Sequence, residues 1–170
     1  MNAAPDDLAQ LVIRLALGAM LCVHGGNKIF GEGGLDGTTR WFAGLGLRPA
    51  WLHARVASST ELGAGGLLMI GLLTTLDCAA VIGLMTVAAA TDHRGKGFFV
   101  FKGGWEYVAI VALVSFALAS AGPGQWSVDH ALGVGFAGAG WAALAAAIGV
   151  LAGLATVLAG TRCPRREGAT

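Results

Sequence analysis

The chain has little charge: Asp, Glu, Lys and Arg make up 12% of its 170 residues, against about 25% in a typical soluble domain. Its net charge is +1 and it has no long basic run, so nothing favours a nucleic-acid partner. The three cysteines form no CxxC pair, which argues against a disulfide framework and against a thiol redox motif. The acidic start, MNAAPDD, lacks the basic region of a signal peptide. We therefore expect the first apolar stretch to remain as a membrane helix.

In place of charge the sequence has 28 glycines and long apolar stretches, and 55% of its residues are hydrophobic. A helix crosses ~30 Å of hydrocarbon with about 20 mostly apolar residues. Five stretches meet this requirement, at residues 8–29, 51–74, 75–92, 105–122 and 131–160. The sequence thus predicts an all-α membrane protein, a bundle of four core transmembrane helices within 1–130 plus a fifth, C-terminal transmembrane helix at 131–160. In the fifth, Gly149 and Gly153 have the spacing that lets helices approach closely in lipid.

The basic residues outside these spans fall on one side of the membrane. With five crossings, loops 24–50 and 93–104 share a side with the short basic tail, 161–170. Of the 11 Lys and Arg residues, all lie on this side except Arg14 and Arg55, which lie within spans. The positive-inside rule then places the N-terminus outside and the C-terminus in the cytoplasm. We expect a multi-pass protein of the bacterial plasma (inner) membrane.

The first long loop contains a second kind of helix. Residues 37–45 predict a short helix with Trp41, Phe42 and Leu45 on one face. Aromatic anchors on an amphipathic segment are typical of a helix in the headgroup layer. A glycine-rich loop packed over the mouth of the bundle is the alternative.

Arg14 and Glu61 are charged residues well inside the apolar spans. An ion in hydrocarbon costs at least ~2.5–3.5 kcal/mol, so such residues usually face a partner or a wet cavity. Arg14 lies on the extracellular side of the middle of its span, and Glu61 lies near the middle of the next. A guanidinium reaches far enough to form a bidentate pair with a carboxylate. We therefore expect an intramembrane ion pair between Arg14 and Glu61, either structural or part of a site for a ligand or proton.

A second polar group is expected near the cytoplasmic mouth, around Glu106 at the start of the fourth span. The side chains expected at this depth are His24, Lys28, His53, Arg55, Glu106 and Tyr107. One acid among several donors, beside an apolar slot, suits an anion, a quinone carbonyl or a mutual salt bridge. A charge that only complements the helix dipole is the alternative for Glu106. No metal site is expected, because His24 and His53 lack a third ligand at motif spacing.

Several short segments form an ordered pattern along the chain. They are RLALG at 14–18, HGGNKIFG at 24–31, GGL at 33–35, WFAGLGL at 41–47, Glu61 with the glycines after it, GGWEY at 103–107 and QWSVD at 125–129. Taken in this order, they resemble the DoxX family of small membrane proteins. The resemblance covers about 11–130 and leaves the fifth span and the tail outside it.

The DoxX resemblance implies a compact membrane bundle of four helices. Family members have been linked to thiosulfate:quinone oxidoreduction, to terminal quinol oxidase subunits and to membrane complexes that handle oxidative stress. Carried over by motif, the resemblance highlights a set of charged residues and one histidine together with the structural glycines Gly25, Gly103 and Gly104. These further positions are Arg14, His24, Lys28, Glu61 and Glu106. The added fifth helix is either a surface for a protein partner or an extra wall.

Three functions remain open from the sequence. The first is a membrane subunit of a quinone-linked redox assembly, contacting quinone or another small ligand at the cytoplasmic-side polar pocket. This function needs a protein partner, since the chain has no visible electron carrier of its own. The second is a non-catalytic assembly or scaffold protein, and the third is a conduit for protons or small solutes through the layer of Arg14 and Glu61.

Overall fold

The computed structural model describes residues 5–161, and its regular structure there is helical throughout. Five long helices, two short ones and one 3-10 turn follow one another along the chain. They are α1 (Pro5–Phe30), α2 (Gly34–Gly44), α3 (Ala50–Ile70), α4 (Thr74–Ala90), η1 (Val100–Lys102), α5 (Glu106–Ala121), α6 (Val128–Ala131) and α7 (Ala139–Thr161). Most of the predicted basic tail, 161–170, lies outside the described residues.

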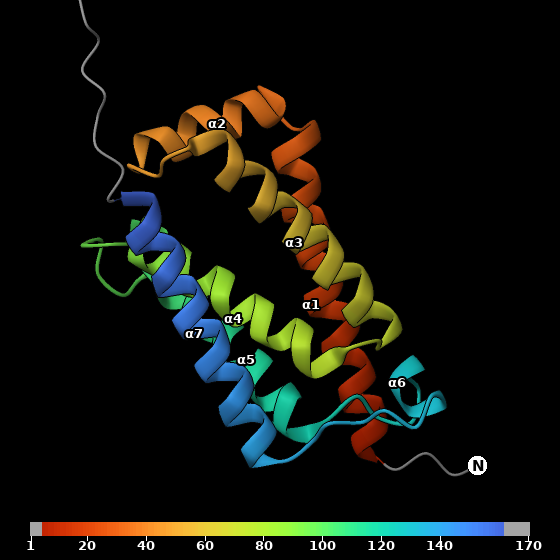
Figure 1. The fold of residues 1–170 in the computed structure, drawn as a ribbon. Coiled ribbons are helices and arrows are strands. Elements are labelled where there is room, and N and C mark those ends of the chain that lie inside the picture. Colours follow the sequence, from red (N-terminus) through yellow and green to blue (C-terminus); the bar gives the residue numbers. More distant parts are fainter. Residues whose placement is uncertain (1–4, 162–170) are drawn as a thin grey trace, which may run out of the picture.

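The long helices form two groups (Figure 1). α1 and α3 pack side by side, while α4 packs on α7 and α5. α2 lies across the end of the bundle where α1 ends and α3 begins. The α3–α4 turn joins the two groups at the opposite end.

A helix is present at each of the five predicted spans. α1 from Asp6 onward and α7 are long and apolar enough to cross a membrane, whereas α4 and α5 are shorter apolar helices. Large apolar side chains are exposed along these helices, as in Val12, Leu113 and Leu151. A lipid environment accounts for such exposure. The predicted fold class, an all-α membrane protein, is confirmed.

The start of the fifth long helix was predicted too early. α7 begins at Ala139 rather than at 131, and residues 132–138 form a loop after α6. Gly133 and Gly138 have φ of 67° and 101°, a conformation that side chains disfavour and that ends a helix. The apolar composition of this loop made it indistinguishable from helix in the sequence.

Glycines set the closest helix contacts in both groups. A Cβ on Gly65 would lie 2.7 Å from the carbonyl oxygen of Gly18, so α1 and α3 meet backbone to backbone. A Cβ on Gly149 would overlap the Ala79 carbonyl, and one on Gly153 would lie 2.8 Å from that of Gly83. The predicted close contact through Gly149 and Gly153 is confirmed, and its partner is α4.

Gly65 and Gly66 give a matched test of this packing. Gly65→Ala is expected to destabilise the protein by about 1–3 kcal/mol, because the added methyl overpacks the α1–α3 contact. A methyl group added at Gly66 would have no atom within 4 Å, so Gly66→Ala is expected to stabilise by about 0.5–1 kcal/mol through helix propensity. Unfolding in mixed micelles measures both changes, and equal effects would contradict the contact.

α2 confirms a short helix in the first loop, beginning at Gly34 rather than at 37. Its Phe42 packs in a small core with Leu47 of the following loop and with Ala50 and Ala54 at the start of α3. Trp41 stays 46% exposed. The position of α2 in the headgroup layer remains a prediction.

The turn between α3 and α4 is capped by a distant carboxylate. The backbone N–H groups of Leu73 and Thr74 donate to the two oxygens of Asp129, at 2.7 and 2.9 Å. Asp129 donates its own N–H to the carbonyl of Gly71 at 2.8 Å. The capping oxygens thus come from α6. This contact fixes α6 against the α3–α4 turn.

Candidate ligand-binding cleft

A cleft of about 600 Å³ lies between the two helix groups. Its walls come from α1, α2 and α3 on one side and from α4, α5 and α7 on the other. Most of the lining is apolar. The small side chains of α4 and α7 that line it are Ala79, Ala80, Gly83, Gly149, Ala152 and Gly153. Small residues leave the space open, so the two groups do not close on each other here.

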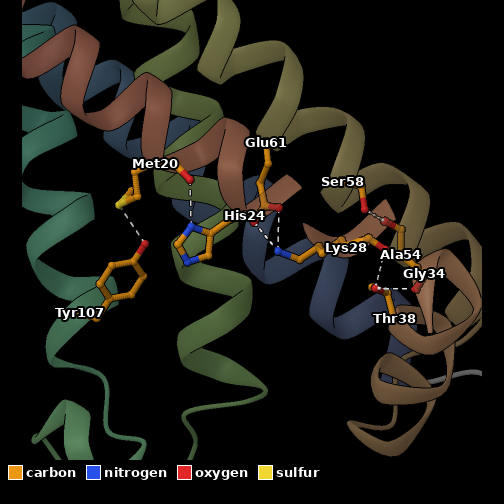
Figure 2. A network of polar contacts seen from close by, with 9 residues as sticks. All are labelled: Met20, His24, Lys28, Gly34, Thr38, Ala54, Ser58, Glu61 and Tyr107. Carbon is orange, nitrogen blue, oxygen red and sulfur yellow. Dashed lines mark hydrogen bonds and ion pairs between the residues drawn. The ribbon is translucent and has the colours of Figure 1, made fainter. Parts of the chain in front are cut away.

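An ion pair lies in the wall of the cleft formed by α1 and α3. The ammonium of Lys28 donates to both carboxylate oxygens of Glu61, at 2.6 and 2.8 Å (Figure 2). A Cβ on Gly25 would lie 3.0 Å from the Cβ of Glu61, so glycine is what allows α3 this close to α1. The Lys28 ammonium has three N–H groups and uses two of them in this pair, so the third can donate to another acceptor.

Two aromatic side chains lie beside this pair. The ring of His24 stacks on that of Tyr107, with centroids 5.9 Å apart and planes at 21°. His24 Nδ1 donates to the carbonyl of Met20 at 2.9 Å, which leaves Nε2 as an acceptor. The Tyr107 hydroxyl donates to the Met20 sulfur at 3.0 Å (Figure 2). Since sulfur is a weak acceptor, that hydroxyl exchanges easily for a better partner.

The charges along the cleft compensate one another. Lys28 balances Glu61, and Asp92 forms a salt bridge with Lys96 at 3.1 Å. His93 Nδ1 donates to the carbonyl of Gly103 at 2.6 Å. The cleft thus offers donors and acceptors whose charges are already paired. Residues 5–161 contain no cluster of three His, Cys, Asp or Glu side chains that could hold a metal ion.

The predicted pair between Arg14 and Glu61 is wrong. Glu61 pairs with Lys28, while Arg14, fully buried, donates through Nη2 to the carbonyl of Trp126. Gly65 contacts Gly18 and Glu61 contacts Gly25 across the α1–α3 interface, so Glu61 lies about two to three turns from the level of Arg14. Arg14 and Glu61 therefore form no shared layer through which a conduit could run.

Two predicted ligand-binding residues lie outside the cleft. Glu106 accepts a hydrogen bond from the backbone N–H of Val100 at 3.0 Å and holds the loop before α5. Arg55 is exposed, with its guanidinium 5.4 Å from the ring centre of Trp51. Sequence position indicates the depth of each residue but not the direction in which its side chain points.

The predicted structural glycines have identifiable roles. Gly103 has a φ of 77° and ends η1, and a Cβ on Gly104 would overlap the Phe98 backbone. Both glycines shape the loop before α5. Gly25 instead allows the close approach of α1 and α3. Of the predicted ligand-binding residues, the structure brings His24, Lys28 and Tyr107 together.

His53 and His93 also line the cleft, although neither was predicted as a ligand-binding residue. His53 had been expected at this depth, and a Cβ on Gly160 would lie 2.9 Å from its Nε2. His93 follows α4 directly, at the basic end of the bundle. The position of His93 after an apolar helix was the feature of the sequence that could have indicated a cleft residue.

A family model covers most of α1 and all of α2, α3 and α4. The DoxX model matches residues 9–94, just over half of the 170-residue chain. The chain belongs to the DoxX family. No curated protein and no solved structure matches it.

Within this DoxX protein, His24, Lys28, Glu61 and His93 fall inside the matched region. Tyr107 and all of α7 fall beyond it. The DoxX resemblance expected for residues 95–130 lies beyond the matched region and stays a prediction. α7 packs on α4 and α5 and lines the cleft, so it forms a wall of the candidate site.

Proposed function

We propose that this DoxX-family protein is a membrane subunit of a quinone-linked redox assembly and that quinone binds at the polar end of the cleft. The observation that carries the proposal is an apolar cleft of about 600 Å³ with few, convergent polar groups: His24, Lys28, Glu61 and Tyr107. Ligand sites are typically built this way, with apolar walls and a small number of orienting polar side chains.

The available donors and acceptors suit both redox forms of a quinone. The third N–H of Lys28 and the hydroxyl of Tyr107 are donors for the carbonyl oxygens of the quinone. His24 Nε2 and Glu61 are acceptors for the hydroxyl groups of the quinol. Electrons would pass between the quinone and a protein partner, which the proposal requires.

The charge distribution supports a bacterial inner-membrane protein with its N-terminus outside and its C-terminus in the cytoplasm. Arg40, Arg48, Arg94, Lys96 and Lys102 belong to α2 and to the loops at one end of the bundle (Figure 1). The positive-inside rule assigns that end to the cytoplasm. The polar end of the cleft would then face the cytoplasmic leaflet.

A scaffold role is the second candidate. Its support is that Lys28 and Glu61 satisfy each other and join α1 to α3 without a ligand. A protein whose charges only hold the bundle together would need no quinone.

Two substitutions in the cleft separate these functions. Tyr107→Phe and His24→Leu each remove one hydrogen-bonding group, so each is expected to weaken quinone binding about fivefold, or ~1 kcal/mol. Arg55→Gln and Glu106→Gln, outside the cleft, should leave affinity unchanged. Titration of the purified protein with a quinone in nanodiscs measures this. Binding that is unaffected by both cleft substitutions would contradict the site, and no binding to the native protein would favour the scaffold.

A further inference from the structure

The cleft is polar at one end and apolar along the rest of its length. The polar end contains His24, Lys28 and Glu61 together with Thr91 and Asp92, which follow α4. The other end is lined by Leu76, Ala79 and Ile148.

The apolar part follows α4 for most of the membrane. Along α4 the apolar lining residues run from Leu76 to Ala88, a rise of about 18 Å at 1.5 Å per residue. α7 contributes an adjacent stripe on the same wall, from Ile148 to Thr156. Such a groove is long enough for an extended hydrocarbon chain.

The groove is open to the membrane rather than to the cytoplasm. Val56, Leu76 and Ile148 line it from α3, α4 and α7 and are 52%, 60% and 48% exposed. At the polar end the gap between α3 and α7 is bridged, because the N–H of Arg48 donates to the carbonyl of Gly160 at 2.9 Å. Figure 1 shows α7 reaching the loop between α2 and α3 at this end. A ligand would enter sideways from lipid.

The polar end favours a head group without charge. The Lys28 ammonium is neutralised by Glu61 at 2.6 Å, so it is no free cation for a phosphate. The stacked rings of His24 and Tyr107 offer a flat surface beside it. These features favour a planar, uncharged, polar ring over a phospholipid head group.

We infer that the ligand of this cleft is a single-tailed amphipathic molecule, with an uncharged polar ring at the His24 end and its apolar tail along the α4–α7 groove. This inference rests on the proposed function. It adds that the α4–α7 groove makes the protein prefer ligands with a long apolar tail. A chain that enters from lipid gains no hydrophobic transfer energy, so its packing in the groove must provide the preference.

Ala152 and Ala155 allow a matched test. Both are exposed on α7, but only Ala152 lines the cleft. The probes are a dimethoxy-methyl-benzoquinone with a decyl tail and the same ring without a tail, with binding expressed per quinone in the bilayer of a nanodisc. We expect the native protein to bind the decyl form about tenfold more tightly, or ~1.4 kcal/mol. Ala152→Phe should abolish that preference without changing affinity for the tailless ring, and Ala155→Phe should keep it.

Three results would overturn the inference. One is equal affinity of the native protein for the two quinones, which leaves the proposed function intact. Another is an equal effect of Ala152→Phe and Ala155→Phe. The third is a co-purified phospholipid that Ala152→Phe displaces while decyl-quinone binding persists. Failure of the native protein to bind either quinone would instead contradict the proposed function itself.

Discussion

Arg14→Leu is expected to destabilise the folded protein by about 3–5 kcal/mol, the cost of leaving a buried polar network incomplete. Arg14 is fully buried, donates to the carbonyl of Trp126 and is attracted by the charge of Asp129. Its removal orphans that carbonyl and takes away a positive charge that attracts the Asp129 carboxylate. Since Asp129 also caps α4, the α3–α4 turn should loosen as well. Unfolding in mixed micelles measures the loss.

Arg55→Leu is the matched control for Arg14→Leu. Arg55 is exposed and contacts the Trp51 ring, so its loss should cost no more than about 1 kcal/mol. Similar losses for Arg14→Leu and Arg55→Leu would contradict the buried network.

Lys28→Leu is expected to destabilise the protein by about 3 kcal/mol, because Glu61 is left as an unpaired, nearly buried carboxylate. Glu61→Leu should cost less, since the Lys28 side chain is longer and can extend toward the head groups. The double variant Lys28→Leu with Glu61→Leu should come within about 1 kcal/mol of the native protein. A double-mutant cycle gives the coupling directly. Additive losses would show that the two charges do not interact.

Periodicity and charge were sufficient to predict the bundle. Apolar stretches of membrane-spanning length located five helices, and the GxxxG spacing of Gly149 and Gly153 identified a close helix contact. The same reasoning misplaced the start of α7. The loop 132–138 is as apolar as the helices, so hydropathy did not separate it from α7, and its glycines are what distinguish it.

The sequence did not predict which charged side chains pair with each other. Arg14 and Glu61 were paired because both are charges within spans, yet the register of α1 against α3 is set by Gly18 and Gly65. That register brings Glu61 beside Gly25 and within reach of Lys28. A sequence indicates the depth of a residue in its own helix, whereas the pairing depends on how two helices slide and rotate against each other.

The depth of a residue in the membrane also did not predict which of Tyr107 and Glu106 faces the cleft. The two are neighbours at the start of α5, but Tyr107 faces the cleft and Glu106 faces its own preceding loop. A rotation of about 100° per residue around the helix decides which side chain reaches the ligand. His24, Lys28 and Tyr107 were predicted as a group and lie together in the cleft. Glu61 also lies there, although it was predicted to pair with Arg14 instead.

Mass spectrometry of the lipids extracted from the purified protein tests the central claim most directly, because it detects a bound quinone without assuming an activity. We predict a quinone content close to one per protein, well above that of an unrelated membrane protein purified from the same membranes. A quinone content no higher than that of the unrelated protein would contradict quinone binding in the cleft.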